Sequence, residues 1–279
     1  MIPDRPRIDD VTDDRIAWRV ASTGTARGTI LLLHGLGGSR LSWQPQLAGL
    51  SQDWRVVAWD MPGYGASPPL PGPLTFEALA DAVAGMVAEL GEHSVHLVGI
   101  SFGGMIAQYV AARYPNVVES LTLLSTSPKF GLDGTSPDEW RAARLAPLEL
   151  GLEPADIAER VLGSLAGPHI APAALTQQIE AMSRISSAAL RRSIECLVTH
   201  DSRALLPSIV APTLCLVGDL DDETPPAYAM AVADLIPGAR LTVVEGAGHL
   251  LNVEAADAVN DAILQHIERV GASSERSQS

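Results

Sequence analysis

The sequence predicts an α/β fold in which a mostly parallel sheet is covered by helices on both faces. Six continuous apolar runs of strand length alternate with stretches in which apolar residues recur at helical spacing. Within these runs, apolar residues rarely alternate with polar ones, which is typical of parallel strands buried on both faces. The repeated order of strand, helix and strand therefore indicates a parallel sheet between two helical layers.

The apolar runs give the expected strands in chain order. They lie at Ile30–Leu33, Val56–Trp59, Val95–Ile100, Leu121–Leu124, Leu214–Val217 and Leu241–Val244. Helical spacing of apolar residues predicts core helices over 76–90, 102–114 and 253–267. Thr75 precedes the first of these helices, and its hydroxyl is suited to cap the helix N-terminus.

The alternation stops between Thr126 and Pro207, where helical pieces occur and no convincing strand is found. The pieces are Glu139–Leu150, Ala155–Leu165 and Ala173–Leu197. We expect residues 126–207 to form a helical cap above one end of the sheet. Residues 1–125 and 208–270 then form the core domain, and residues 271–279 are expected to be a frayed polar tail.

Composition limits the classes of partner. The 279 residues are 47% apolar and carry 19 basic and 33 acidic side chains, a net charge of −14. The electric field of this negative charge repels phosphate backbones and anionic lipids, so neither nucleic acid nor a membrane surface is expected as a partner.

The first 14 residues lack the apolar centre of a signal peptide, and we expect a cytoplasmic protein. Cys196 and Cys215 are interpreted as small buried apolar residues.

The segment Gly99–Gly104, with the sequence GISFGG, is the most informative motif. It follows an apolar strand and opens a helix, which is the setting of a nucleophile elbow. The strained turn requires small residues two positions before and two positions after its apex, and Gly99 and Gly103 supply them. Ser101 at the apex then lies at a helix N-terminus, where developing negative charge is favoured. A single G-x-S-x-G motif is also compatible with an ordinary tight turn.

A serine nucleophile needs a base, and the base needs an acid that orients it. His249 follows the last strand in a glycine-rich loop, at the edge of the sheet where α/β proteins place their sites. Four carboxylates follow the preceding strand, at Asp219, Asp221, Asp222 and Glu223. An isolated acidic run is usually a solvated turn. Its position between the serine and His249 instead favours a catalytic acid from this run.

Other histidines are assigned structural or solvated roles. His93 and His96 have the spacing of metal ligands, but no third ligand accompanies them and no metal site is expected. His34 is different from these histidines. It precedes the glycines of the segment Gly35–Gly38, a loop expected to bring backbone amides close to a ligand.

The elbow, acidic turn and final histidine together resemble the α/β-hydrolase superfamily over nearly the whole chain. The resemblance implies Ser101, Asp221 and His249 as the catalytic triad, with Asp222 as the fallback acid and Asp219 less favoured. It also implies that the amides of Leu36 and Phe102 form the oxyanion hole. No cofactor is implied.

A serine at the apex argues against dehalogenases and epoxide hydrolases of this fold, which carry aspartate there. Segments such as Ser125–Gly131 and Gly248–Glu254 resemble the 3-oxoadipate enol-lactonase-like group of esterases and lactonases. We therefore expect a serine hydrolase that cleaves a small-molecule ester or lactone. Alternatives are a carbon-carbon hydrolase of the meta-cleavage type, disfavoured because Leu250 replaces that group's tryptophan, and a non-catalytic ligand receptor.

Expected substrate contacts are Trp43, Trp140 and Leu145. A carboxylate-bearing lactone would also need a cation in the pocket, because a bidentate guanidinium suits a carboxylate. The cap arginines considered for this role are Arg141, Arg144, Arg184, Arg191, Arg192 and Arg203.

Overall fold

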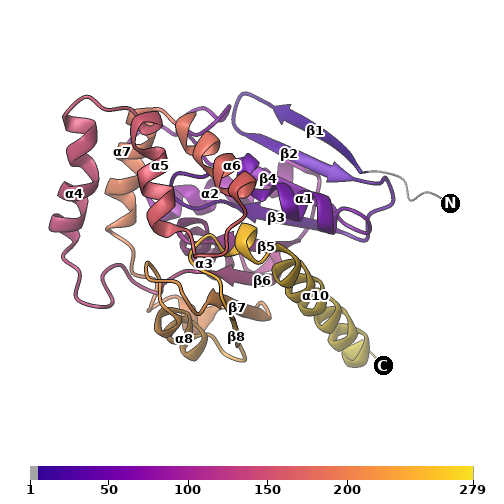
Figure 1. The fold of residues 1–279 in the computed structure, drawn as a ribbon. Coiled ribbons are helices and arrows are strands. Elements are labelled where there is room, and N and C mark those ends of the chain that lie inside the picture. The colour runs from indigo at the N-terminus through magenta and orange to yellow at the C-terminus, as the bar shows by residue number, and fades with distance from the viewer. Residues whose placement is uncertain (1–5, 279) are drawn as a thin grey trace.

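A computed structural model describes residues 6–278 and has a central sheet with helices on both sides (Figure 1). Within these residues, eight strands form one sheet in the order β1-β2-β4-β3-β5-β6-β7-β8. The strands are β1 Arg7–Thr12, β2 Ala17–Ser22, β3 Thr29–Leu33, β4 Arg55–Asp60, β5 Val95–Ile100, β6 Val118–Leu124, β7 Thr213–Gly218 and β8 Arg240–Val244. The expected α/β fold class is confirmed.

The six strands that the apolar runs predicted, β3 to β8, pair with one another in parallel. The first two strands were not predicted, and they pair antiparallel at one edge of the sheet. Their sequences explain the omission. β1 reads RIDDVT and contains no fully buried residue, so its hydrogen bonds to β2 define it rather than an apolar run.

Helices connect the strands and cover the sheet. The α-helices are α1 Gln44–Leu50, α2 Phe76–Glu89, α3 Phe102–Arg113, α4 Pro137–Glu149, α5 Pro154–Leu165, α6 Pro172–Ser183, α7 Ser187–Leu197, α8 Pro226–Leu235, α9 Leu251–Glu254 and α10 Ala256–Gln278. Short 3-10 helices are η1 Arg40–Trp43, η2 Pro115–Val117 and η3 Leu206–Ser208. Thr75 caps α2 as expected, because its Oγ1 accepts a hydrogen bond from the Ala78 amide at 3.1 Å.

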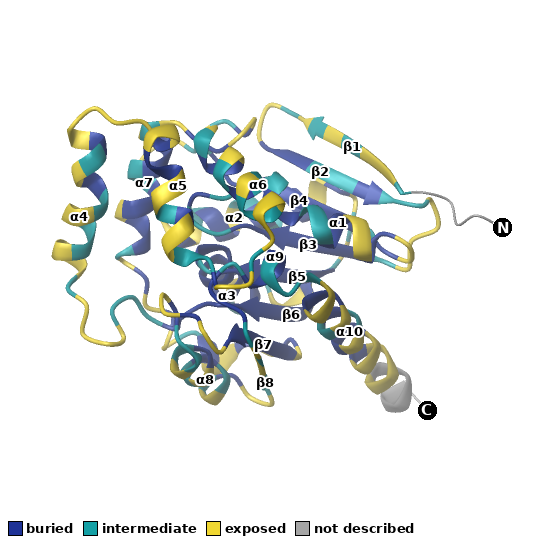
Figure 2. Ribbon diagram, in the orientation of Figure 1, coloured by how far each residue is buried: buried dark blue, intermediate teal, exposed yellow. Residues whose placement is uncertain are grey.

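Alternate residues of each central strand face opposite helical layers. In β3, Leu31 and Leu33 pack in the cluster that contains residues of α2, α3 and α8. Ile30 and Leu32 pack in a second cluster with residues of α1 and α10. Figure 2 shows the central strands as buried, with exposed residues on the outer sides of the helices. Burial on both faces therefore accounts for the continuous apolar runs of the sequence.

Helices α4 to α7 are inserted between β6 and β7 and gather at one end of the sheet (Figure 1). The segment 173–197, expected as one helix, is divided into α6 and α7. Ser186 caps the second of these, because its Oγ accepts a hydrogen bond from the Ala189 amide at 3.2 Å. Helix α10 extends to Gln278, through most of the segment expected as a polar tail. Residue 279 and residues 1–5 lie outside the described part of the chain.

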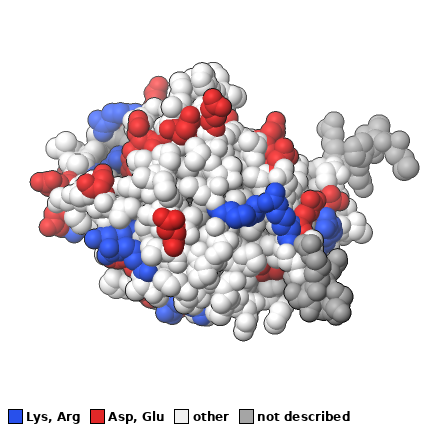
Figure 3. Space-filling model, turned by 90° about the horizontal axis from the view of Figure 1, so that it is seen from below, with Lys and Arg blue, Asp and Glu red and all other residues white. Residues whose placement is uncertain are grey.

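Surface charge is mixed rather than of one sign on the face seen in Figure 3. Lys and Arg side chains lie there among Asp and Glu side chains, and most of this face is uncharged. No helix within residues 6–278 is both long enough and apolar enough to cross a membrane.

Candidate active site

Ser101 lies at a sharp turn between β5 and α3. Its backbone φ is +53°, a conformation that L-residues with side chains rarely adopt. Two hydrogen bonds hold this strained turn. The Ser101 amide donates to the Leu124 carbonyl at 2.9 Å, and Thr126 Oγ1 donates to the Ser101 carbonyl at 2.9 Å. The neighbouring strand β6 and the loop after it therefore support the conformation of Ser101.

Glycines on both sides of Ser101 allow the turn to form. A Cβ atom added to Gly99 would lie 2.4 Å from the carbonyl oxygen of Gly103. One added to Gly103 would lie 2.1 Å from the carbonyl oxygen of Leu33. Any side chain at these positions would displace backbone, so the glycine spacing found in the sequence is a steric requirement of this turn.

His249 reaches both Ser101 and Asp221 from the loop after β8. Its Nε2 lies 3.0 Å from Ser101 Oγ, and its Nδ1 lies 3.0 Å from each carboxylate oxygen of Asp221. All three distances are within hydrogen-bond range. Three residues that lie far apart in the sequence thus form a continuous chain from hydroxyl to imidazole to carboxylate.

Asp221 is held by the turn that follows it. One carboxylate oxygen accepts hydrogen bonds from the amides of Thr224 and Glu223, at 2.8 and 3.1 Å. The Thr224 hydroxyl donates to the other oxygen at 3.0 Å and also lies 3.3 Å from His249 Nδ1. Thr224 was not singled out in the sequence, because threonine in a turn carries no distinctive signal.

The other acids of this turn are placed differently. Asp222 is exposed and lines the cavity, but it makes no hydrogen bond to the His249 ring, which is bonded to Asp221 instead. Asp219 accepts a hydrogen bond from the Gly246 amide, and its side chain is exposed. Among the candidate acids, the geometry brings Asp221 to the histidine.

Charge stabilises the ionised form of each partner in this pair. Burial raises the pKa of the Asp221 carboxyl, but the His249 ring and the Thr224 amide lower it more, so the pKa lies below its ordinary value. Burial lowers the pKa of His249, and the Asp221 carboxylate reverses this effect, so the pKa lies above its ordinary value. The imidazolium is therefore stabilised relative to an isolated buried histidine.

The loop after β3 forms a wall beside Ser101. A Cβ atom on Gly35 would lie 3.2 Å from the Ser101 Cβ. Leu36 lines the adjacent cavity. In the described residues, neither the Leu36 amide nor the Phe102 amide has a hydrogen-bond acceptor. Two backbone donors thus remain free, one in the residue after Ser101 and one in a residue that lines the same cavity.

His34 fixes this loop and does not take part in the hydroxyl–imidazole–carboxylate chain. Its Nδ1 lies 2.9 Å from the Gly35 carbonyl, and its Nε2 accepts a hydrogen bond from the Met61 amide at 3.0 Å. Burial lowers the pKa of His34. A neutral ring that donates from Nδ1 and accepts at Nε2 satisfies both contacts.

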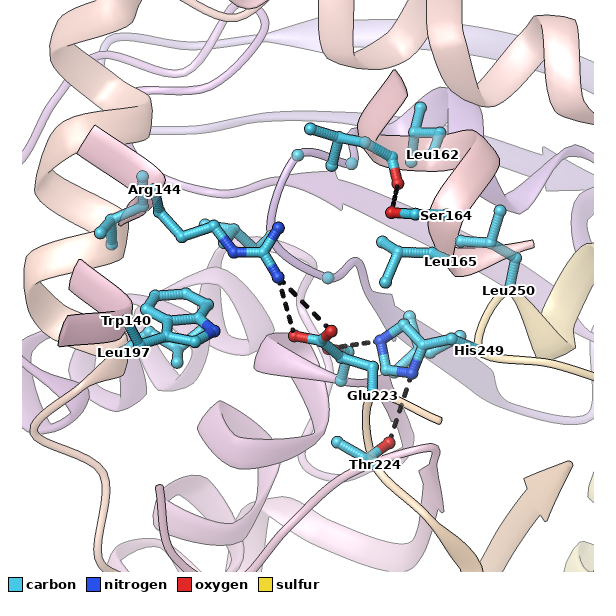
Figure 4. A pocket seen from close by; sticks show the side chains of 18 of the residues that line it. Trp140, Arg144, Leu162, Ser164, Leu165, Leu197, Glu223, Thr224, His249 and Leu250 are labelled. Carbon is cyan, nitrogen blue, oxygen red and sulfur yellow. Dashed lines mark hydrogen bonds and ion pairs between the residues drawn. The ribbon is translucent and has the colours of Figure 1, made fainter. Parts of the chain in front are cut away.

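A cavity of about 610 Å³ opens above Ser101 and His249. Its far wall comes from the inserted helices, including Leu162, Ser164 and Leu165 of α5 (Figure 4). The cavity is of the size that small-molecule ligands occupy. The inserted helices therefore face the carboxyl ends of the strands, where the Ser101 and His249 loops lie.

The expected substrate contacts fall into two groups. Trp140 lines the cavity and is in edge contact with Phe130. Leu145, on the same helix, is buried and packs in the core instead. Trp43 does not line the cavity either, because its ring is fully buried in a cluster with residues of α1. Apolar character alone did not distinguish a core position from a cavity position.

Of the six cap arginines considered, Arg144 alone lines the cavity. Its guanidinium points toward Glu223, with a nitrogen 3.5 Å from the carboxylate, and it also lies 5.1 Å from the centre of the Trp140 ring (Figure 4). Two further cationic side chains, Lys129 and Arg160, also line the cavity. The sequence analysis did not include them among the candidates for binding a substrate carboxylate. Arg160 could have been found from its place on the same face of α5 as Ile157.

Metal-ligating side chains do not form a cluster in the part of the chain that the structure covers. Groups of three or more His, Cys, Asp and Glu side chains that could hold a metal ion are absent from residues 6–278. His96 instead contacts Ser120 Oγ at 2.9 Å, beside the ring of Trp54. Cys196 and Cys215 are both buried free thiols.

Known proteins resemble this chain over most of its length. The protein named "Putative carbamate hydrolase RutD" from Yersinia enterocolitica is 30% identical over 87% of this chain and 88% of its own length. A pimeloyl-[acyl-carrier protein] methyl ester esterase from Neisseria meningitidis is 30% identical over 82% of this chain and 73% of its own. The solved enol-lactonase from Burkholderia xenovorans LB400 is 26% identical, with a TM-score of 0.81 over 93% of this chain and 100% of its own.

A sequence model of a protein family also matches this chain. The model described as "Alpha/beta hydrolase family" matches residues 30–262, which include the serine turn, the acidic turn and the histidine loop. The chain therefore belongs to the alpha/beta hydrolase family.

Proposed function

We propose that the protein is a serine hydrolase that cleaves a small carboxylic ester through an acyl-enzyme intermediate. The observation that carries this proposal is the hydrogen-bonded chain from Ser101 Oγ through His249 to Asp221. A serine hydroxyl becomes a useful nucleophile when an oriented imidazole can take its proton. The similarity to a named methyl ester esterase and a named enol-lactonase supports ester or lactone substrates.

In the first half of the reaction, Ser101 Oγ attacks the ester carbonyl carbon while His249 Nε2 takes the hydroxyl proton. The carbonyl oxygen becomes an oxyanion, for which the free amides of Leu36 and Phe102 are the proposed donors. Collapse of the tetrahedral intermediate breaks the bond to the alcohol oxygen, and His249 returns its proton to that oxygen. The alcohol leaves, and the acyl group stays on Ser101.

Water completes the cycle. His249 takes a proton from the water as it attacks the acyl carbon, and the same oxyanion donors serve again. Collapse releases the carboxylic acid and restores the Ser101 hydroxyl. Asp221 keeps Nδ1 protonated and stabilises the imidazolium in both halves of the cycle.

The inserted helices have a separate proposed role. We infer that residues 126–207 form a cap domain on a core made of residues 1–125 and 208–270. Because helices α4 to α7 supply much of the cavity wall, this cap would select the acyl group and exclude water during transfer.

A lactone is the second candidate substrate, and Arg144 is the observation that favours it. A carboxylate on a lactone could bind the Arg144 guanidinium in the cavity, in exchange for its contact with Glu223. No comparable observation favours a carbon-carbon hydrolase of the meta-cleavage type. That group usually carries a tryptophan after the histidine, and here Leu250 lines the cavity at that position. A non-catalytic ligand receptor would not need the hydrogen bond between Ser101 and His249, so this contact favours an enzyme.

The test is turnover of p-nitrophenyl acetate and butyrate, with mass spectrometry of the quenched enzyme. The expected result is hydrolysis together with an acyl group on the peptide that contains Ser101. A panel with a lactone, a carbamate and a vinylogous diketone then assigns the substrate class. Binding of these compounds without turnover would instead indicate a receptor, and turnover without a Ser101 adduct would contradict the acyl-enzyme.

A further inference from the structure

We propose that Glu254 is the positioning residue of His249, and that its carboxylate fastens the inserted helices to the histidine loop. Its effect on catalysis rests on the proposed function. Glu254 is the last residue of the short helix α9 and does not line the cavity. Its effect on the reaction is therefore exerted through the residues that it holds and through its charge, which helps to raise the pKa of His249.

Three backbone amides donate to this one carboxylate. Oε2 accepts from Gly248 at 2.8 Å, and Oε1 accepts from Leu250 at 2.9 Å. These two residues flank His249, so the carboxylate is bonded on both sides of the histidine. Such charge-assisted hydrogen bonds are stronger than bonds between neutral groups.

The third amide belongs to the inserted segment. Gly167, in the turn between α5 and α6, donates to Glu254 Oε2 at 3.0 Å. The His249 amide also donates to the Leu165 carbonyl at the end of α5, at 3.2 Å. The histidine loop is therefore attached to the inserted segment through the Glu254 carboxylate and through a direct backbone bond.

Two glycines make this contact possible. A Cβ atom added to Gly167 would lie 2.2 Å from Glu254 Oε2 and 2.7 Å from the Gly248 amide nitrogen. A Cβ atom added to Gly248 would lie 2.6 Å from the Gly167 amide nitrogen. The two backbones are in direct contact, and a side chain on either glycine would separate them.

The position of this contact explains why it matters for the reaction. His249 follows β8, the edge strand of the sheet, so β-pairing constrains this region from one side only. A catalytic group displaced by about 1 Å can lose a rate factor of about 100. The Glu254 contact supplies the missing constraint, and it also ties the cavity wall formed by α5 to the catalytic base.

The first test replaces Glu254 by glutamine, which keeps the size but turns an NH₂ group toward the backbone donors. We expect Glu254→Gln to lower kcat on the order of 10- to 100-fold with KM nearly unchanged, because the cavity wall is intact. Asp257→Asn is the matched control for loss of a nearby negative charge, since Asp257 is exposed and outside the cavity. The control should keep the wild-type kcat.

A second pair of variants tests the same contact from the inserted segment. Gly167→Ala places a methyl group against Glu254 and Gly248, and it should lower kcat as Glu254→Gln does. Gly163→Ala is its control, because a Cβ atom at Gly163 meets nothing within 4 Å. Equal losses in both alanine variants, or wild-type kcat in Glu254→Gln, would overturn the proposal.

Amide hydrogen exchange measured by NMR gives a readout independent of activity. In folded Glu254→Gln, exchange should accelerate at Gly167, Gly248 and Leu250 and stay unchanged in the central strands. Unchanged exchange at these three amides would refute the role of Glu254. If the wild-type protein hydrolyses no ester, the proposed function fails, and the exchange result still decides whether Glu254 holds the loop.

Discussion

His249 Nε2 lies 3.0 Å from Ser101 Oγ, although 148 positions separate the two residues in the chain. The contact joins a turn at the centre of the sheet to a loop at its edge. Its catalytic importance is tested by Ser101→Ala, which removes the hydroxyl and keeps the Cβ that the turn already accommodates. By comparison with other triad knockouts, kcat should fall by about 10⁶-fold.

The measurement is hydrolysis of p-nitrophenyl butyrate by enzyme purified in parallel with wild type, with circular dichroism to verify the fold. Residual activity within tenfold of wild type, in a preparation free of contaminating esterase, would remove Ser101 from the mechanism.

Asp221 and Asp222 provide a comparison of neighbouring carboxylates. Asp221→Asn should lower kcat by about 10⁴-fold, because an amide no longer stabilises the required imidazole tautomer. Asp222→Asn should remain close to wild type, since Asp222 is exposed and makes no hydrogen bond to the ring. Reversed effects in steady-state kinetics would move the acid by one residue and leave the rest of the proposal unchanged.

The sequence predicted the parallel strands and the spacing of the elbow because both depend on local patterns. It did not predict β1 and β2, whose residues are only partly apolar and whose pairing is non-local. Trp43 and Leu145 were expected at the site, but apolar character does not tell a core position from a cavity position. Thr224 was missed because a threonine in a turn carries no distinctive signal. Glu254 was missed because folding alone brings the Gly167 amide to its carboxylate.

The pH dependence of activity follows from the charges around His249. Its base form must be neutral, so kcat/KM should fall as the pH drops through the His249 pKa. Burial lowers this pKa, and the carboxylates of Asp221, Glu223 and Glu254 raise it to a value above the ordinary one. Asp221→Asn removes the largest of these carboxylate effects, so its acidic limb should move to lower pH.

The measurement is a profile of kcat/KM against pH for wild type, Asp221→Asn and Asp222→Asn. The Asp222 variant serves as the control and should keep the wild-type acidic limb. An acidic limb that is the same in all three proteins would mean that a group other than His249 controls it.

Trp140 and Leu145 lie on the same helix and should respond differently to truncation. Trp140→Ala enlarges the cavity, so it should change the ratio of kcat/KM for long and short acyl esters. Leu145→Ala should instead lower the free energy of unfolding by about 2–5 kcal/mol, because it leaves a void in the core. Chemical denaturation and an acyl-chain series separate the two effects, and a selectivity change in Leu145→Ala alone would reverse the assignment.

Arg144 distinguishes an anionic lactone from a neutral ester as the preferred substrate. The net charge of −14 disfavours anions in general, but charges more than about 8 Å away are largely screened at physiological salt. The charges that line the cavity therefore determine whether an anionic substrate binds. In the cavity, Arg144 is already paired with Glu223. Exposed ion pairs contribute only about 0–1 kcal/mol, so a substrate carboxylate can compete for the guanidinium.

If the substrate is a carboxylate-bearing lactone, Arg144→Ala should raise its KM strongly and spare a neutral ester of similar size. Loss of the guanidinium also leaves the Glu223 carboxylate uncompensated, which adds repulsion toward an anion. Arg141→Ala is the matched control, because Arg141 pairs with Asp138 on the outside of the same helix and does not line the cavity. Steady-state kinetics with both substrates measure the effect. Equal behaviour of the two substrates in Arg144→Ala would exclude a lactone carboxylate at this position and favour a neutral ester.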